Sequence, residues 1–284
     1  MHYDETTSEW RDLPNGARAD RHLFAIPDIH GHADLLERML SHVGRVAREQ
    51  PRTVVFLGDL TDRGPETMRA IDLALNAKTQ FDHHIILPGN HEGMLLEGLD
   101  LPLNTGAFHF WYENGGSAVV DELPGGGTGT PEELREQLRC AFPEGFLDDM
   151  RTAPGHFRCG DLTLLHAGMR PPVGPDPAEA RKRFLAQPLA DAPREHWAWI
   201  RRPFLEWRGG WDADRREVIV HGHTVLADRT FDTASEAAVA ADHVESHARL
   251  SLDMGIYDYG QLLCLEALDG RYRFHLVTRS EYLP

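Results

Sequence analysis

Six side chains of the kinds that bind divalent metal ions are spread along this chain. They are Asp28, His30, Asp59, Asn90, His166 and His223. Together they offer carboxylate, amide and imidazole groups without thiolate, a set that suits Mn, Fe or Zn better than Ca or copper(I). A carboxylate such as Asp59 can bridge two ions about 3.5–4 Å apart, which activate a water molecule and hold phosphoryl oxygens. These residues predict a two-metal hydrolytic centre.

Three neighbouring residues suit the rest of a phosphoryl-transfer site. His91 directly follows Asn90, so we expect it at the rim of the metal cluster, where a general acid for the leaving-group oxygen should stand. Asp62 can hold the His91 imidazole in one tautomer and favour its cationic form. Arg63 follows Asp62 and offers paired donors to phosphate oxygens. We assign Asn90 both to the metals and to the phosphate.

Short apolar runs and helical patterns alternate in the first third of the chain. Residues 22–26, 53–57 and 84–87 are rich in Val, Ile, Leu and Phe and end in Gly or Pro, as expected for buried strands. Between them, apolar residues at three- and four-residue steps indicate helices over about 35–46 and 68–75. This order predicts parallel strands with right-handed crossovers in an α/β fold.

The predicted strands place the metal-type ligands at one edge of the sheet. Asp28, Asp59 and Asn90 are each 31 residues apart, and each comes just after a strand. Sites in open α/β sheets form at this C-terminal edge. Side chains alternate along an extended backbone, so Asp28 and His30 should point to the same side.

The rest of the chain suggests one domain with an insertion. We interpret residues 1–20 as a loose N-terminal leader and residues 21–284 as a single domain. A mostly helical insertion covers about 97–155, where aromatic residues and a glycine-rich stretch replace the strand pattern. Apolar runs at 262–268 and 272–277 are joined by Asp-Gly, a favourable hairpin turn.

Composition limits the partners of the protein. The formal net charge of −16 argues against general nucleic-acid binding and against docking on anionic lipid. The three cysteines are widely spaced and outside any metal-binding or disulfide pattern, as in a cytoplasmic protein with reduced thiols. No apolar run approaches the roughly 18 residues needed to span a bilayer. We expect a soluble, cytoplasmic protein.

Five ordered segments carry a family resemblance. They are Asp-Ile-His-Gly from residue 28, Gly-Asp-Leu-Thr-Asp-Arg-Gly from 58, Gly-Asn-His-Glu from 89, Leu-His-Ala-Gly from 165 and His-Gly-His-Thr from 221. This set resembles the phosphoprotein phosphatase branch of the calcineurin-like metallophosphoesterases over residues 22–277. The resemblance implies a two-sheet β-sandwich flanked by helices, with one metal held by Asp28, His30 and Asp59. A second metal would be held by Asp59, Asn90, His166 and His223.

The resemblance also implies roles for residues outside the metal set. It pairs His91 with Asp62, and it indicates the histidine before Thr224 as the ligand, which is His223 and not His221. Trp199-Ile200-Arg201 resembles a Trp-x-Arg element of bacterial and phage members, which favours Arg201 over Arg202 as a phosphate ligand.

One departure from the family pattern leaves the substrate open. Protein-specific members usually carry Arg where this chain has Pro88, whereas bacterial relatives resembling symmetrical diadenosine tetraphosphate hydrolases lack it. We predict a bacterial-type Ser/Thr protein phosphatase, of single or dual specificity, acting by direct attack of a metal-bridging hydroxide. It would use two divalent ions, Mn first with Fe or Zn as alternatives. The alternatives are a dinucleoside polyphosphate hydrolase and a non-enzymatic binding protein on the same scaffold. The sequence does not indicate an oligomeric state.

Overall fold

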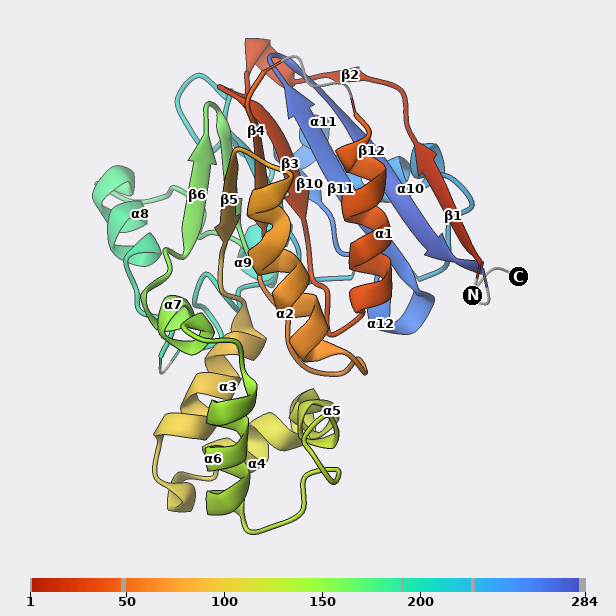
Figure 1. Ribbon diagram of the computed structural model, residues 1–284. Coiled ribbons are helices and arrows are strands. Elements are labelled where there is room, and N and C mark those ends of the chain that lie inside the picture. Colours follow the sequence, from red (N-terminus) through yellow and green to blue (C-terminus); the bar gives the residue numbers. More distant parts are fainter. Residues whose placement is uncertain (1, 47–49, 191, 226–227, 281–284) are drawn as a thin grey trace.

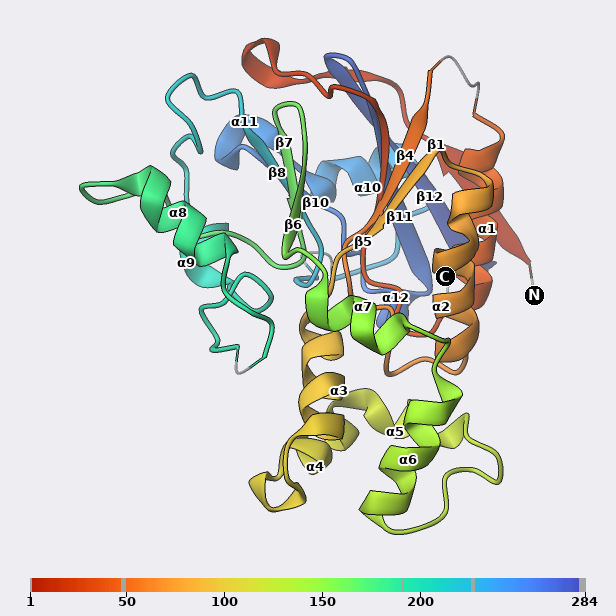
Figure 2. The same cartoon turned by 60° about the vertical axis from the view of Figure 1, so that its left-hand side comes forward.

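The computed structural model describes residues 2–46, 50–190, 192–225 and 228–280, and its strands form two sheets (Figures 1 and 2). The strands are β1 (Tyr3–Thr7), β2 (Arg11–Asp12), β3 (His22–Ile26), β4 (Arg52–Phe56), β5 (His83–Ile86), β6 (His156–Cys159), β7 (Leu162–Leu165), β8 (Val218–His221), β9 (Asp242–His243), β10 (Arg249–Ser251), β11 (Gln261–Leu268) and β12 (Arg271–Arg279). The first sheet has the order β1-β12-β11-β3-β4-β5, with β2 also paired to β12, and the second has the order β6-β7-β8-β10-β9.

The pairing of the first sheet confirms the predicted parallel unit. Strand β4 pairs in parallel with both β3 and β5, and its Phe56 lies opposite Ile26 on one side and Ile86 on the other. The predicted hairpin is also confirmed, because β11 and β12 are antiparallel over their full length. The turn places Asp269 at φ 53°, a left-handed conformation that Asp tolerates better than most residues.

Alternate residues of β3 and β4 face two different cores, which explains why the apolar residues of these strands form continuous runs. Phe24 and Val54 belong to the core beneath the helices of the outer face. Leu23 and Val55 belong to a second core, which also contains Leu164 from the second sheet. A strand buried on both faces reads as a continuous apolar run.

Helices cover the outer face of the first sheet, and further helices make up the segment of the chain between β5 of the first sheet and β6 of the second. They are α1 (Ala33–Gly44), α2 (Thr67–Asn76), α3 (Asn90–Asp100), α4 (Ala107–Trp111), α5 (Ser117–Asp121), α6 (Pro131–Ala141), α7 (Phe146–Thr152), α8 (Pro177–Leu185), α9 (Arg202–Leu205), α10 (Ala234–Ala241), α11 (Val244–His247) and α12 (Ile256–Tyr259), with short turns η1 (Pro14–Gly16), η2 (Ala77–Thr79), η3 (Leu103–Thr105) and η4 (Tyr112–Gly116). Helices α1 and α2 lie on the outer face of the first sheet, and α3 to α6 form a lobe below the sheets (Figures 1 and 2). We call α3 to α6 the helical lobe.

The N-terminal segment is part of the sheet, so the expectation of a loose leader over residues 1–20 is wrong. Strand β1 forms the edge of the first sheet, with Tyr3 opposite Arg279 and Thr7 opposite His275. The hydroxyl of Tyr3 also donates to Asp34 on α1 at 2.7 Å. The segment is polar because an edge strand is solvated on its outer side, and this polarity made it resemble a leader.

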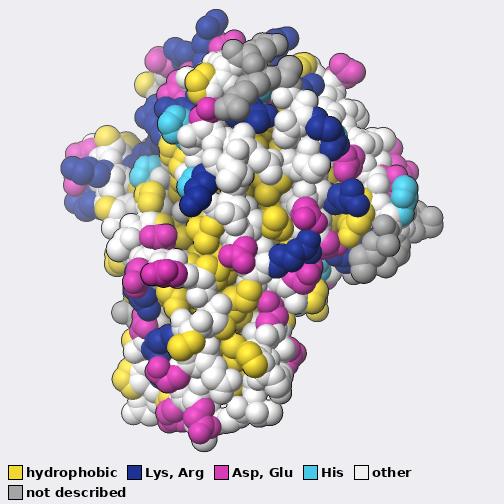
Figure 3. All heavy atoms as spheres, viewed as in Figure 1, with side chains coloured by type: hydrophobic (Ala, Val, Ile, Leu, Met, Phe, Trp, Pro, Cys, Tyr) yellow, Lys and Arg dark blue, Asp and Glu magenta, His cyan; other side chains and the backbone are white. Residues whose placement is uncertain are grey.

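Charged side chains of both signs are interspersed over the face shown in Figure 3. Although the net charge is −16, the acidic residues do not form a single continuous patch on this face. Among the described residues, no helix is long and apolar enough to cross a membrane.

Candidate metal centre

The loops after β3, β4 and β5 meet at one edge of the first sheet. The loop after β4 comes so close to the loop after β5 that a Cβ on Gly58 would lie 2.3 Å from the backbone nitrogen of Gly89. Gly58 also has φ 97°, which only glycine adopts without strain. Glycine at this position therefore allows two ligand-bearing loops to lie in contact.

The backbone at the centre is left-handed where the sequence predicted an extended strand end. His30 has φ 46° and Asp59 has φ 53°, and Asp62, Arg63 and His223 also have positive φ. Asp28 and His30 consequently reach the same cleft through a turn and not through strand alternation. Such conformations cost energy for residues other than glycine and concentrate at functional sites.

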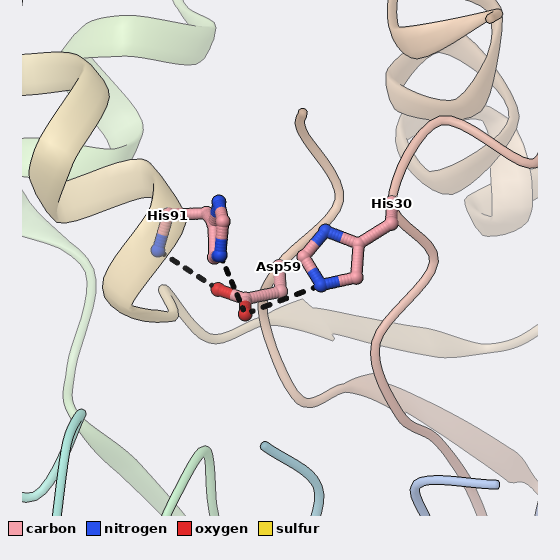
Figure 4. Close-up of side chains that lie close together, drawn as sticks. All are labelled: His30, Asp59 and His91. Atoms are coloured by element: carbon pink, nitrogen blue, oxygen red, sulfur yellow. Dashed lines mark hydrogen bonds and ion pairs between the residues drawn. The ribbon is translucent and has the colours of Figure 1, made fainter. Parts of the chain in front are cut away.

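Asp59 lies at the middle of the cluster. Its Oδ2 is 3.4 Å from Nε2 of His166, 3.7 Å from Nε2 of His30 and 4.0 Å from Nε2 of His91. Figure 4 shows the rings of His30 and His91 on either side of this carboxylate. Two buried groups of metal-ligand atoms share Asp59, one with His30 and His91 and the other with His166 and His223, and within each group the atoms lie within 4.8 Å of one another.

The imidazole rings are oriented so that one nitrogen of each faces the cluster. Nδ1 of His30 bonds to the carbonyl of Thr61 at 2.9 Å, and Nδ1 of His166 bonds to the carbonyl of Leu57 at 2.9 Å. A carbonyl only accepts, so both Nδ1 atoms donate, and Nε2 of each ring is the atom that faces the cluster and can bind a metal once it carries no proton. Nε2 of His223 is buried and has no hydrogen-bond partner among the described residues. The donor set and this orphaned nitrogen fit a pair of divalent ions.

Asp28 and His223 are joined through the backbone. The amide of His223 donates to Oδ1 of Asp28 at 2.8 Å. A Cβ on Gly222 would lie 2.1 Å from the same oxygen, so a larger residue would displace the carboxylate. The glycine before His223 is therefore required for Asp28 to reach the cleft.

Asn90 and the pair of His91 and Asp62 complete the predicted set. Oδ1 of Asn90 is 2.9 Å from Nε2 of His166. Nδ1 of His91 is 2.7 Å from Oδ2 of Asp62, and Oδ1 of Asp62 accepts from the indole of Trp111 at 2.9 Å. Asp62 is thus held from the helical lobe while it orients His91, whose Nε2 faces the cleft.

Both arginines predicted to bind phosphate line the cleft with the metal-type residues. The guanidinium of Arg63 lies 3.0 Å from Nε2 of His30 and 2.9 Å from Nε2 of His91. Arg201 is the residue before α9 and lines the same cavity, whose volume is about 480 Å³. Two positive groups therefore face the place where the metal-type ligands converge.

The protonation states follow from burial and from the carboxylates. Burial holds the pKa of His30 and of His223 well below the ordinary value, so both rings are neutral at neutral pH. Burial also opposes ionisation of Asp59, but the adjacent His166 and His91 outweigh it and hold the pKa of Asp59 well below its usual range. Burial likewise opposes the cationic form of His166, yet Asp59 raises its pKa to about 9. A metal bound by His166 would therefore displace a proton.

His221 has a different environment from His223. Its two ring nitrogens lie 2.9 Å from the carbonyl of Gly222 and 2.8 Å from the hydroxyl of Ser251. Burial lowers its pKa to about 3, so it is a neutral ring engaged on both sides. This geometry favours His223 as the ligand, because both ring nitrogens of His221 already have hydrogen-bond partners.

Three residues at the site were missed by the sequence reasoning. Glu92 accepts hydrogen bonds from four backbone amides of the loops that carry the ligands. Its only sequence signal was its place at the third position of α3, from which a glutamate can accept from the amide of the residue before the helix, here Gly89. Asp253 lines the cleft just after β10, a strand of three residues that is too short to recognise by pattern. Burial raises the pKa of Asp253 to about 6. Trp111 contacts Asp62 from 49 residues away, and no local pattern indicates this contact.

Comparison with known proteins agrees with this fold and gives the family. Residues 22–247 match the family described as calcineurin-like phosphoesterase. A solved cold-active protein tyrosine phosphatase has a TM-score of 0.50 at 18% identity, covering 90% of this chain and 77% of that one, which supports the fold. The chain therefore belongs to the calcineurin-like phosphoesterase family.

Two curated relatives have different named activities. The chain is 29% identical over 156 residues to the asymmetrical bis(5'-nucleosyl)-tetraphosphatase PrpE of Bacillus subtilis, covering 51% of this chain and 57% of that protein. It is 32% identical over 101 residues to serine/threonine-protein phosphatase 2 of Escherichia coli, covering 36% of this chain and 41% of that protein. The matched regions span about half the length of these relatives, so their substrates are not transferred by similarity.

Proposed function

We propose that this protein is a two-metal phosphoester hydrolase. The observation that carries the proposal is that Asp59 belongs to both buried groups of metal-ligand atoms. One ion would be held by Asp28, His30 and Asp59, and the other by Asp59, Asn90, His166 and His223. When bound, the ions would supply an activated water and positive charge against the phosphoryl oxygens.

The remaining residues of the cleft would bind the phosphate and move a proton. Arg63 and Arg201 would hold the equatorial oxygens, where negative charge is spread in the transition state. His91 would donate a proton from Nε2 to the departing oxygen, and Asp62 would keep that ring oriented. His91 also lies close enough to Asp59 to be a metal ligand, so a variant at this position must be tested for metal content.

For the substrate, we propose a phosphorylated serine or threonine of a protein. Support comes from the ordered set of five segments that this chain shares with protein phosphatases, and from the similarity to the Escherichia coli phosphatase. Mn is the proposed metal, with Fe and Zn as alternatives, because the ligands are oxygen and nitrogen atoms only.

A dinucleoside polyphosphate is the second candidate substrate. Pro88 is buried beside the centre, where protein-specific members of the family are expected to present an arginine to phosphate. The similarity to the Bacillus subtilis tetraphosphatase favours the same alternative. In that case the same residues would cleave an anhydride instead of an ester.

The test is phosphate release by metal-free protein that is reloaded separately with Mn, Fe or Zn. The substrates are p-nitrophenyl phosphate, a phosphothreonine peptide and diadenosine tetraphosphate, each assayed with every metal. Peptide turnover well above the nucleotide supports the protein phosphatase, and the reverse order supports the second candidate. Absence of turnover on all three substrates, with metal bound, would contradict the enzymatic proposal and favour a binding protein.

A further inference from the structure

A second hollow opens directly from the metal-site cleft. It has a volume of about 780 Å³ and shares Met94, Asn114, Trp199 and Arg201 with the cleft. One wall belongs to α3 and α4 of the helical lobe, and the other is the segment that leads into α9. We call this hollow the lateral groove. A group attached to a phosphate at the metal centre would extend into it, because the two hollows have these four residues in common.

Two of the arginines of the lateral groove, Arg194 and Arg202, have no acidic partner among the described residues, whereas Arg201 faces the carboxylates of the metal centre. Arg194, Arg201 and Arg202 line it, and within the described ranges none of their side chains has an ion pair or hydrogen bond. The two acidic residues that line the groove within the described part of the chain are both engaged, because Glu195 accepts from Arg170 at 2.8 Å and Glu97 has an interaction partner. In a chain with net charge −16, this surplus of positive charge beside the centre favours an anionic occupant.

Aromatic side chains are also available in the lateral groove. Phe110, on α4, is 53% exposed although its neighbours Phe108 and Trp111 are buried. Trp199 is half-buried on the opposite wall, with its ring centre 6.1 Å from that of His223. Exposed aromatic faces bind flat heterocycles by stacking. Arginines together with exposed rings therefore suit a ligand that has both a phosphate chain and a base.

We propose that the lateral groove binds the leaving group of the substrate and selects a nucleoside whose phosphate chain continues beyond the scissile phosphorus. Arg202 and Arg194 would contact these further phosphates, and Phe110 would stack on the base. This inference rests on the proposed two-metal hydrolysis at the metal centre, and it favours a nucleoside polyphosphate over the phosphorylated serine or threonine as the substrate. It assigns a role to Arg202, which lies in the groove and not in the cleft.

The reaction on such a substrate is a simple hydrolysis. The oxygen of water forms a bond to the terminal phosphorus, and the bond from that phosphorus to the bridging oxygen breaks. The electron pair leaves with the bridging oxygen, and a proton from the water is released. A nucleoside triphosphate thus gives the diphosphate and inorganic phosphate, with no other reactant.

The test compares kcat/KM for ATP, AMP, inorganic tripolyphosphate and p-nitrophenyl phosphate, with Mn in excess of the nucleotide. In Arg202→Gln and Arg194→Gln, the ratio of kcat/KM for ATP to that for p-nitrophenyl phosphate should fall about 10- to 100-fold, because each variant loses a charge-assisted contact to phosphate. Phe110→Ala should reduce ATP turnover more than tripolyphosphate turnover. Arg183→Gln, on the exposed surface of α8 outside the groove, is the matched control and should leave every ratio unchanged.

The outcomes separate this inference from the proposed function. If the parent protein hydrolyses p-nitrophenyl phosphate but the arginine variants lose ATP and p-nitrophenyl phosphate activity equally, the groove has no role in selectivity and the inference is wrong. The inference would also be overturned if the parent protein preferred an acidic phosphopeptide over ATP and the arginine variants lost activity on that peptide. Failure of the parent protein on every substrate would instead contradict the proposed function.

Discussion

Replacement of Glu92 by glutamine tests whether one buried carboxylate holds the loops of the metal centre in place. Oε1 of Glu92 accepts from the amides of Leu60 and Thr61 at 2.8 and 3.3 Å. Oε2 accepts from the amides of Asp59 and Gly89 at 2.8 and 2.7 Å. The side chain is fully buried, so these four donors have no access to solvent. Glu92 thus joins the loop after β4 to the loop after β5.

Glu92→Gln keeps the size of the side chain but removes two of the four acceptor contacts. The amide oxygen can still accept from one pair of donors, while the NH2 group meets the other pair. A buried donor without an acceptor costs about 1–3 kcal/mol, so the free energy of unfolding should fall by about 2–6 kcal/mol. That is a large share of the roughly 5–15 kcal/mol typical of a folded protein. The affinity for metal should also fall, because Asp59 lies in the loosened loop.

Urea denaturation of the metal-free protein measures the free energy of unfolding, and equilibrium metal binding measures the affinity for metal. Glu132→Gln is the control for the substitution itself, because Glu132 is exposed on α6 and should change stability by only a few tenths of a kcal/mol. Glu122→Gln is the control for location. Glu122 accepts from the amides of Thr67 and Met68 at the start of α2, so its loss should destabilise the fold without weakening metal binding. A Glu92→Gln protein within about 0.5 kcal/mol of the parent would refute this account.

Three further predictions concern the centre and the sheet. His91→Ala should keep both metals, as measured by metal analysis. Its turnover of a phosphothreonine peptide should fall about 10²- to 10⁴-fold, with turnover of p-nitrophenyl phosphate less affected. Loss of metal in this variant would show that His91 is a ligand. Asp59→Asn should weaken both metal sites in calorimetric titrations, and loss of one ion alone would exclude the bridging role. Burial lowers the pKa of His42 and of His275, so their neutral forms stabilise the fold above about pH 6.5 and this contribution is lost as pH falls. Urea denaturation at pH 7 and pH 5 measures this effect. Between these two pH values, the free energy of unfolding should fall less in His42→Gln than in the parent protein, and an equal fall would contradict this reasoning.

The sequence predicted the parts of the fold in which local pattern and burial agree. Strands β3, β4 and β5 are within one residue of the predicted ranges. In β3 and β4 both faces are buried, so the apolar runs are continuous, whereas β5 is only partly buried and its short run of Ile and Leu was enough to indicate it. Strand β1 was missed for the opposite reason. An edge strand needs no apolar run, and its pairing partner β12 lies more than 260 residues away.

The candidate site was predicted as a set of residues but not as a geometry. The structure brings Asp28, Asp59 and Asn90 together, as the repeat of strand ends suggested, and places His30 and His166 beside them. The left-handed turns were not predictable, because Asp and His adopt them only when surrounding contacts impose them. Support from Trp111 and Glu92 depends on contacts between distant loops, which a single sequence does not display.

The pairing of β1 with β12 has a mechanical consequence. Tyr3 lies opposite Arg279, the amide of Ser280 donates to the carbonyl of His2 at 3.0 Å, and Figure 1 shows β1 beside β12. The strands are antiparallel, so a force that pulls the two ends of the chain apart loads the ladder one hydrogen bond at a time. Such a pair unzips at low force, whereas strands pulled along their length resist in shear. In a single-molecule pulling experiment, β1 should therefore detach first, while the parallel strands that position the metal centre are still folded.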